Sequence, residues 1–142
     1  ILLHLQYYLV ELIMCINYFF YIMAIFIRTK DPKELLGLIR SQIDNNIIKY
    51  WVYDPDGDIT CIKEELLGKA WLHPYLLDGF LAFGIMGRKN VQLSIDTYSV
   101  YHGEFVEILL NKLGSHYSSI IIKAPFENTL DTKNIENNYS YE

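Results

Sequence analysis

Residues 47–62 have the sequence IIKYWVYDPDGDITCI. Two runs rich in β-branched and aromatic residues, 47–53 and 59–62, flank the sequence DPDGD at 54–58. Proline is favoured at the second position of a type I turn, and glycine accepts the left-handed conformation that follows. The pattern therefore predicts a β-hairpin.

A strand and a helix are expected before this hairpin. Residues 23–28, MAIFIR, predict a buried first strand. Asp31 can cap a helix whose first turn holds a proline, and Glu34 completes a capping box. An apolar stripe at helical spacing follows, and Asn45-Asn46 ends the helix. The stripe consists of Leu35, Leu36, Leu38, Ile39 and Ile43.

The sequence after the hairpin predicts a short helix and then a second hairpin. Residues 63–72, KEELLGKAWL, are expected to be helical with Trp71 inward, up to His73-Pro74. Strands are expected at 80–86 and 91–97, because the second of these runs alternates apolar and polar residues.

A second long helix, about 100–113, is expected to start at Ser99, and the last strand is expected at 118–122. Hairpins outnumber crossovers in this order of elements. The predicted fold is therefore α+β: a two-layer sandwich with a mainly antiparallel sheet and two main helices packed on one face.

The composition divides the chain into an apolar leader (1–22), a single α+β domain (23–123) and a flexible acidic tail (124–142). Three interpretations of the leader stay open: translated sequence upstream of a start at Met23, a membrane anchor over 7–27, or a folded core helix. A signal peptide fits less well, because no basic region precedes the apolar run.

Charge and composition exclude several classes of protein. Of 142 residues, 51% are hydrophobic and 15% aromatic, which excludes a disordered chain. The net charge of −5 argues against binding nucleic acid through its phosphates. Two cysteines cannot form a disulfide framework, and no glycine-rich nucleotide motif occurs, so we expect no cofactor.

Two groups of residues could carry chemistry. Asp54, Asp56 and Asp58 alternate as cation ligands do, but an EF-hand requires glycine at the sixth position, where Ile59 stands, so a plain turn is the favoured interpretation. The second group consists of His73, His102 and Glu104 as candidate catalytic residues beside Tyr98. His102 is expected in the first turn of the second helix, where the helix dipole favours a neutral imidazole.

Aromatic residues are dense, with 12 Tyr and 7 Phe, and some of them are expected at a binding surface. The candidates for that surface are Trp51, Tyr53, Tyr75, Tyr98 and Tyr101.

We therefore expect a cytoplasmic, bacterial-type module that binds another protein and occludes it, as an immunity protein or antitoxin does. The alternative is a small hydrolase-like enzyme with a pocket near His102, Glu104, Tyr98 and His73. Contact with a membrane is expected only if 7–27 form an anchor, with the C-terminal domain then in the cytoplasm.

Overall fold

The structure is a computed structural model that describes residues 1–10 and 24–125. Most of the predicted leader and tail therefore lies outside the described residues. Residues 2–10 are helical and exposed. Within the described ranges, no helix combines the length and the apolar character that crossing a bilayer requires.

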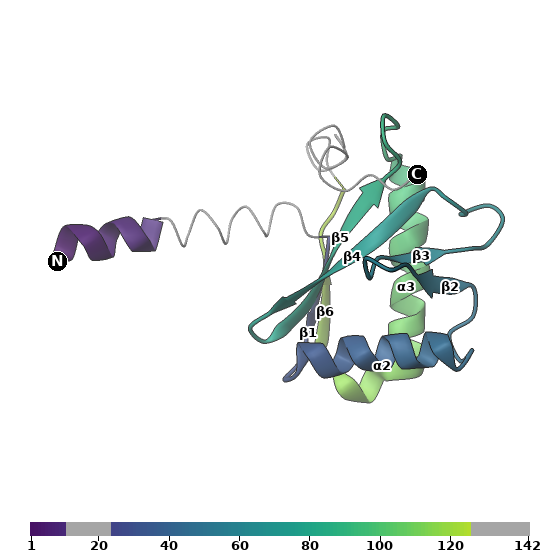
Figure 1. Cartoon of the computed structure of the whole chain (residues 1–142), viewed down its shortest axis with the longest axis horizontal. Coiled ribbons are helices and arrows are strands. Elements are labelled where there is room, and N and C mark those ends of the chain that lie inside the picture. The colour runs from purple at the N-terminus through teal and green to yellow at the C-terminus, as the bar shows by residue number, and fades with distance from the viewer. Residues whose placement is uncertain (11–23, 126–142) are drawn as a thin grey trace.

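Six strands form one sheet in the order β2-β3-β4-β5-β1-β6, and every registered pair is antiparallel (Figure 1). This confirms the predicted α+β class. The strands are β1 (Ile25–Arg28), β2 (Trp51–Tyr53), β3 (Ile59–Cys61), β4 (Ala70–Leu77), β5 (Phe80–Gly87) and β6 (Ser119–Ile122). The helices within residues 24–125 are α2 (Pro32–Asp44), α3 (Ile95–Leu113) and the short 3₁₀ helix η1 (Gly114–His116).

The first helix and the first hairpin are confirmed. The Asp31 carboxylate accepts a hydrogen bond from the Glu34 N–H at 3.0 Å, which caps α2 as its sequence predicts. In the hairpin, β2 pairs with β3, and Gly57 adopts a φ of 85° in the turn between them. The Asp54 carboxylate accepts hydrogen bonds from the N–H groups of Asp56 and Asp58, both at 3.0 Å, and so holds the turn together.

The prediction of a helix over 63–72 is wrong. Residues 64–69 form turns, with Gly68 at a φ of 69°, and β4 starts at Ala70 and runs through His73 and Pro74. The registered pair between β3 and β4 joins Ile59 to Leu72, and Pro74 lies beyond it. A proline is tolerated there, because its missing N–H is not needed for pairing with β3.

The second hairpin is also placed differently from the prediction. β4 and β5 are joined by the two-residue turn Asp78-Gly79, with Leu77 opposite Phe80. Gly79 supplies the positive φ, 77°, that this turn needs. The predicted strand 91–97 does not form, because Ser94 caps α3 by accepting a hydrogen bond from the Thr97 N–H at 3.0 Å. The helix therefore starts at Ile95, before the predicted cap Ser99.

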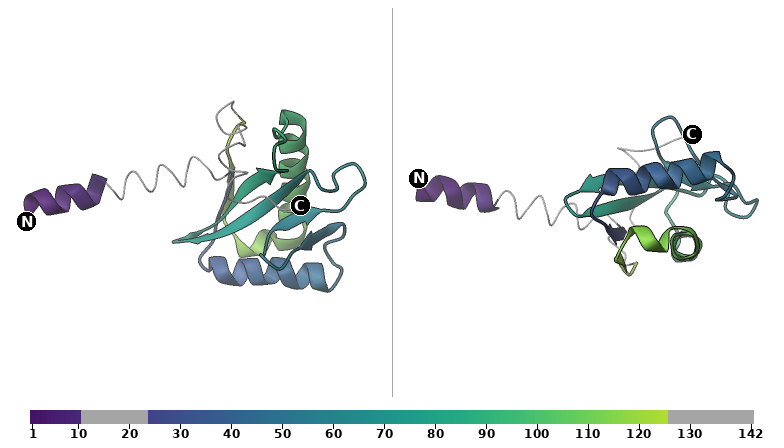
Figure 2. Two further views of the ribbon diagram at one scale, coloured as in Figure 1. Left: turned by 45° about the horizontal axis from the view of Figure 1, so that its top comes forward. Right: turned by 90° about the horizontal axis from the view of Figure 1, so that it is seen from below.

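Both helices pack on the same face of the sheet, as predicted. Leu35 and Ile39 of α2 and Phe105 of α3 belong to one buried cluster with strand residues that point the same way. These strand residues include Ile25, Leu72 and Phe83, which register alignment places on one face. The two helices cross, since the right-hand view of Figure 2 shows α3 end-on while α2 lies lengthwise.

Candidate binding face

The residues that alternate with the core residues point to the opposite face of the sheet, which we call the aromatic face. It consists of Phe26, Trp71, His73, Tyr75, Leu77 and Phe80, from β1, β4 and β5. Phe26 packs with Tyr75, Leu77 and Phe80 in a second, smaller apolar cluster. None of the helices in the described part of the chain lies on this face, because α2 and α3 share the other one.

The central strands are apolar on both faces. Leu72 and Phe83 point to the helices, whereas Trp71, Tyr75 and Ala82 point to the aromatic face. An antiparallel sheet with one face in water normally alternates apolar and polar residues, and a sheet covered on both faces does not. The residues of β4 and β5 therefore fit a sheet whose aromatic face is also covered.

A contact between a buried carboxyl group and an imidazole lies within this apolar surface. The Asp58 carboxylate contacts the His73 imidazole at Nδ1, and Asp58 is completely buried. The two residues are cross-strand neighbours, because Ile59 is in register with Leu72. The His73 ring also meets the Tyr75 ring edge-on, with the ring centroids 4.9 Å apart.

Arg28 supplies a positive charge at the border of the aromatic face. Its guanidinium lies 5.6 Å from the centroid of the Phe80 ring, in a cation–π contact. Phe80 in turn meets Phe26 edge-on at 6.3 Å. An apolar centre with a charged border is the usual anatomy of a protein–protein interface.

The structure does not bring the four predicted enzyme residues together. His73 lies on the aromatic face, whereas His102 is buried in α3, on the other side of the sheet. The Tyr98 hydroxyl donates to the Lys123 carbonyl at 2.6 Å, beside the end of β6. Glu104 instead pairs with Lys63 Nζ at 2.6 Å, near β3.

His102 lies well inside α3, not in its first turn as predicted. Its Nδ1–H donates to the Tyr98 carbonyl at 2.6 Å, and its ring stacks on Tyr98 with centroids 3.9 Å apart. Burial lowers the pKa of His102, although the hydrogen bond to Tyr98 opposes that shift. Desolvation by burial therefore favours the neutral imidazole.

Of the five predicted binding residues, Tyr75 alone belongs to the aromatic face. Trp51 and Tyr101 are core residues whose rings meet edge-on at 5.6 Å, and the Tyr101 hydroxyl donates to the Leu66 carbonyl at 2.8 Å. Tyr98 is also buried. The Tyr53 hydroxyl donates to Asp44 of α2 at 2.7 Å, which ties the hairpin to that helix.

Four members of this face were not predicted from the sequence: Phe26, Trp71, Leu77 and Phe80. Trp71 was predicted on a helix that does not form. The missed signal is Asp78-Gly79 between two apolar runs, since such a dipeptide is typical of a two-residue hairpin turn. Recognising that turn would have aligned β4 with β5 and shown that both strands are apolar on both faces.

The three aspartates of the first hairpin do not converge on a cation. Asp54 binds the backbone of its own turn, and Asp58 turns away to contact His73. In the described ranges, no group of three or more histidine, cysteine or acidic side chains is placed to hold a metal ion. The Asp54 carboxylate thus holds the hairpin turn together, and the Asp58 carboxylate joins the hairpin to β4.

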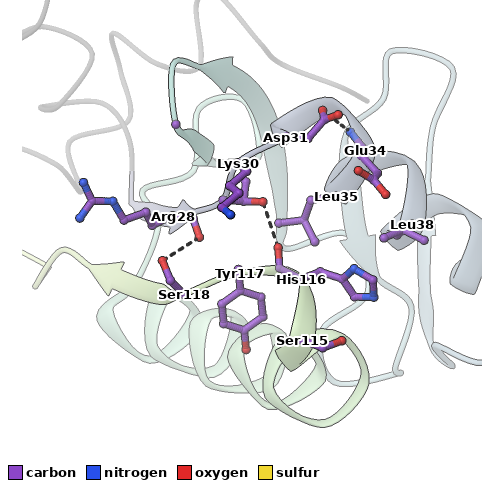
Figure 3. A pocket seen from close by; sticks show the side chains of 12 residues that line it. Arg28, Lys30, Asp31, Glu34, Leu35, Leu38, Ser115, His116, Tyr117 and Ser118 are labelled. Atoms are coloured by element: carbon purple, nitrogen blue, oxygen red, sulfur yellow. Dashed lines mark hydrogen bonds between the residues drawn. The ribbon is translucent and has the colours of Figure 1, made fainter.

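A hollow of about 590 Å³ lies between the β1–α2 connection, the first turns of α2 and the segment that joins η1 to β6 (Figure 3). The Thr29 hydroxyl donates to the His116 carbonyl at 2.9 Å across its floor. Its border mixes Arg28 and Lys30 with Asp31 and Glu34, so neither sign of charge prevails. The described hydrogen bonds there hold these loops together, and no catalytic pair is formed by them.

The chain matches no protein-family model, no curated protein and no solved structure.

Proposed function

We propose that this protein is a binding module that occludes another protein through its aromatic face. One observation supports the proposal most strongly. The strands β4 and β5 carry apolar side chains on both faces, and the two helices cover one of them. Burying apolar surface contributes roughly 25 cal/mol per Å², so a partner that covers the partly exposed side chains of Leu77 and Phe80 gains free energy.

The chemistry of the face indicates the kind of partner. Tryptophan, tyrosine and arginine are the residue types enriched at the energetic centres of protein interfaces, and Trp71, Tyr75 and Arg28 represent all three. The expected partner surface is apolar at its centre and presents a carboxylate at the edge, opposite Arg28. A nucleic acid is not expected, since phosphate binding requires several cations.

The occlusion of a partner, as in an immunity protein or antitoxin, is the form of this function that we favour. A rigid sheet face with its side chains fixed by cross-strand packing can cover a partner's surface without moving. The enzyme alternative is not supported by the geometry, because His73 and His102 lie on opposite faces of the sheet.

Two adjacent leucines provide a matched test. Leu77 belongs to the aromatic face, and Leu76 points to the other face of the same strand and is 53% exposed. The full chain is purified with a C-terminal tag from its own cells, and the co-purified protein is identified and purified separately. We expect Leu77→Asp to weaken the reconstituted complex at least about tenfold, which corresponds to about 1.4 kcal/mol, and Leu76→Asp to leave it within about twofold.

A charge test accompanies the apolar one. Arg28→Glu is expected to weaken the complex about fivefold, whereas Lys33→Glu, the same charge change on α2, leaves the affinity unchanged. Thermal unfolding of each variant checks that the fold is intact. Equal affinities for Leu77→Asp and the wild-type chain, in a folded variant, would overturn the proposal.

A further inference from the structure

The outer edge of β6 is a second surface, and no hydrogen bond within residues 24–125 is described at its outward backbone groups. β6 is the last strand of the sheet, and no described strand pairs with its outer side. The Lys123 N–H donates to the Ala24 carbonyl at 2.9 Å, so this pair is hydrogen-bonded. Because such pairs alternate in an antiparallel ladder, the N–H and C=O groups of Ile120 and Ile122 point away from β1.

The side chains of this edge are apolar and exposed. Ile121 is 51% exposed and Ile122 is 44% exposed, and no charged residue occurs from Tyr117 to Ile122. Edge strands are normally protected by lysine, proline or a bulge, because an unprotected edge recruits another strand. The composition of β6 therefore favours the addition of a strand.

One flank of α3 continues this surface. Glu104 binds Lys63, so the flank of α3 that carries Glu104 faces β3. Successive residues of a helix are rotated by about 100°, so the positions on the other side of the buried stripe face β6. The five residues of this β6-facing flank carry no charge, and the acids Asp96 and Glu107 border it beside Gly103. The flank consists of Ile95, Ser99, Gly103, Val106 and Leu110. Leu110 is 64% exposed, and a Cβ placed on Gly103 would meet no atom within 4 Å.

We propose that two copies of this chain pair through β6, with Ile121 opposite Ile121 of the second copy. In this register, the outward groups of Ile120 meet those of Ile122 in the other copy, so the ladder continues. Lys123 then faces Ser119 of the other copy and not its own counterpart. The register therefore places no like charges opposite each other across the two-fold axis.

The same two-fold axis brings the α3 flanks together. An axis perpendicular to the sheet keeps the helix-covered faces of both copies on one side, so the uncharged flanks face each other. A four-residue strand spans only roughly 13 Å. Because a stable interface buries about 1,200 Å² or more, the contact between the helices supplies area that β6 alone lacks. Gly103 lets the two backbones approach closely.

A disulfide across the two-fold axis tests the register. Ile121 and its counterpart would form a non-hydrogen-bonded pair with their Cα atoms about 4.5 Å apart, a separation that a disulfide can span. In a full chain carrying Cys15→Ser, Ile121→Cys is expected to form a covalent dimer under mild oxidation. Val52→Cys, at the other edge of the sheet and 38% exposed, is the control and stays monomeric under denaturing conditions.

Sedimentation of the full chain at micromolar concentration tests the association itself. We expect twice the chain mass of 16.7 kDa for the wild-type chain and for Val52→Lys, and a dimer at least about tenfold weaker for Ile121→Lys. Gly103→Ala should weaken the dimer, whereas Gly37→Ala, at an equally open position of α2, should not. A monomeric wild-type chain, or a dimer that tolerates Ile121→Lys, would overturn the inference. Leu77→Asp should leave the dimer intact, so partner binding and self-association can fail separately.

Discussion

The buried carboxylate of Asp58 lies against the imidazole of His73 across two neighbouring strands. The contact joins the end of the first hairpin to the middle of β4, although β3 and β4 share one registered pair, Ile59 with Leu72. A side-chain contact therefore reinforces the weakest junction of the sheet. The same contact fixes the orientation of His73 within the aromatic face.

Asp58→Ala should destabilise the fold strongly. The substitution removes the Nδ1 partner of His73 and leaves a void beneath the aromatic face, so we expect the free energy of unfolding to fall by about 3 kcal/mol. Urea unfolding monitored by tryptophan fluorescence measures the change. The control is Asp56→Ala in the same turn, which is exposed and should change stability by less than about 0.5 kcal/mol. A loss for Asp58→Ala no larger than that of the control would show that the contact stabilises nothing.

Gly57→Ala should destabilise the hairpin by more than a positive φ alone requires. Gly57 has a φ of 85°, and a Cβ there would lie 2.7 Å from the Arg40 guanidinium. The Arg40 guanidinium, which lies 5.7 Å from the centroid of the Tyr53 ring, would therefore have to shift. The comparison is Gly68→Ala, which has a φ of 69° and open space around it. We expect Gly57→Ala to cost about 0.5–1 kcal/mol more than Gly68→Ala in urea unfolding; equal losses would mean that Arg40 moves at no cost.

The elements that could be predicted from the sequence are those with local signals. The cap formed by Asp31 and Glu34 and the turn around Gly57 are contacts between residues close in sequence, so their motifs identify α2 and the first hairpin. The class of fold follows from these elements and their order. The apolar stripe of each helix predicts that one side of the helix is buried, but the face of the sheet that it covers comes from the strand register.

The elements that could not be predicted depend on tertiary context. Residues 63–72 contain good helix formers, but Trp71 and Leu72 are held in β4 by pairing with β5. The alternation of apolar and polar residues at 91–97 predicted a strand, but Ser94 caps a helix there. The Ser94 hydroxyl accepts a hydrogen bond from the Thr97 N–H, so the helix starts before Ser99. The Asp58–His73 contact and the aromatic face depend on the register of β4, which no local motif encodes.

The His102 imidazole should make stability depend on pH on the acidic side. Burial lowers its pKa in the folded state below the ordinary 6.5, so the unfolded chain takes up a proton first as the pH falls. The stability due to the neutral imidazole is complete above pH 6.5 and is lost progressively below it. We expect His102→Gln to flatten this decline between pH 7 and pH 5 in urea unfolding. His116→Gln, an exposed position in η1, is the control. Parallel curves for His102→Gln and the wild-type chain would contradict the assignment.

The Tyr98 hydroxyl should produce the opposite dependence in alkali. Burial raises its pKa from 10.0 to about 12, so the unfolded chain loses the phenolic proton first as the pH rises. The corresponding stability is complete below pH 10 and falls by about 1–2 kcal/mol between pH 10 and pH 12. Tyr98→Phe removes this part of the slope and, at neutral pH, costs about 1 kcal/mol because the Lys123 carbonyl loses its donor. Tyr50→Phe, at an exposed position, should change neither quantity. Since Tyr98 joins α3 to the end of β6, a Tyr98→Phe chain that keeps the wild-type alkaline slope would place the titrating group elsewhere in the core.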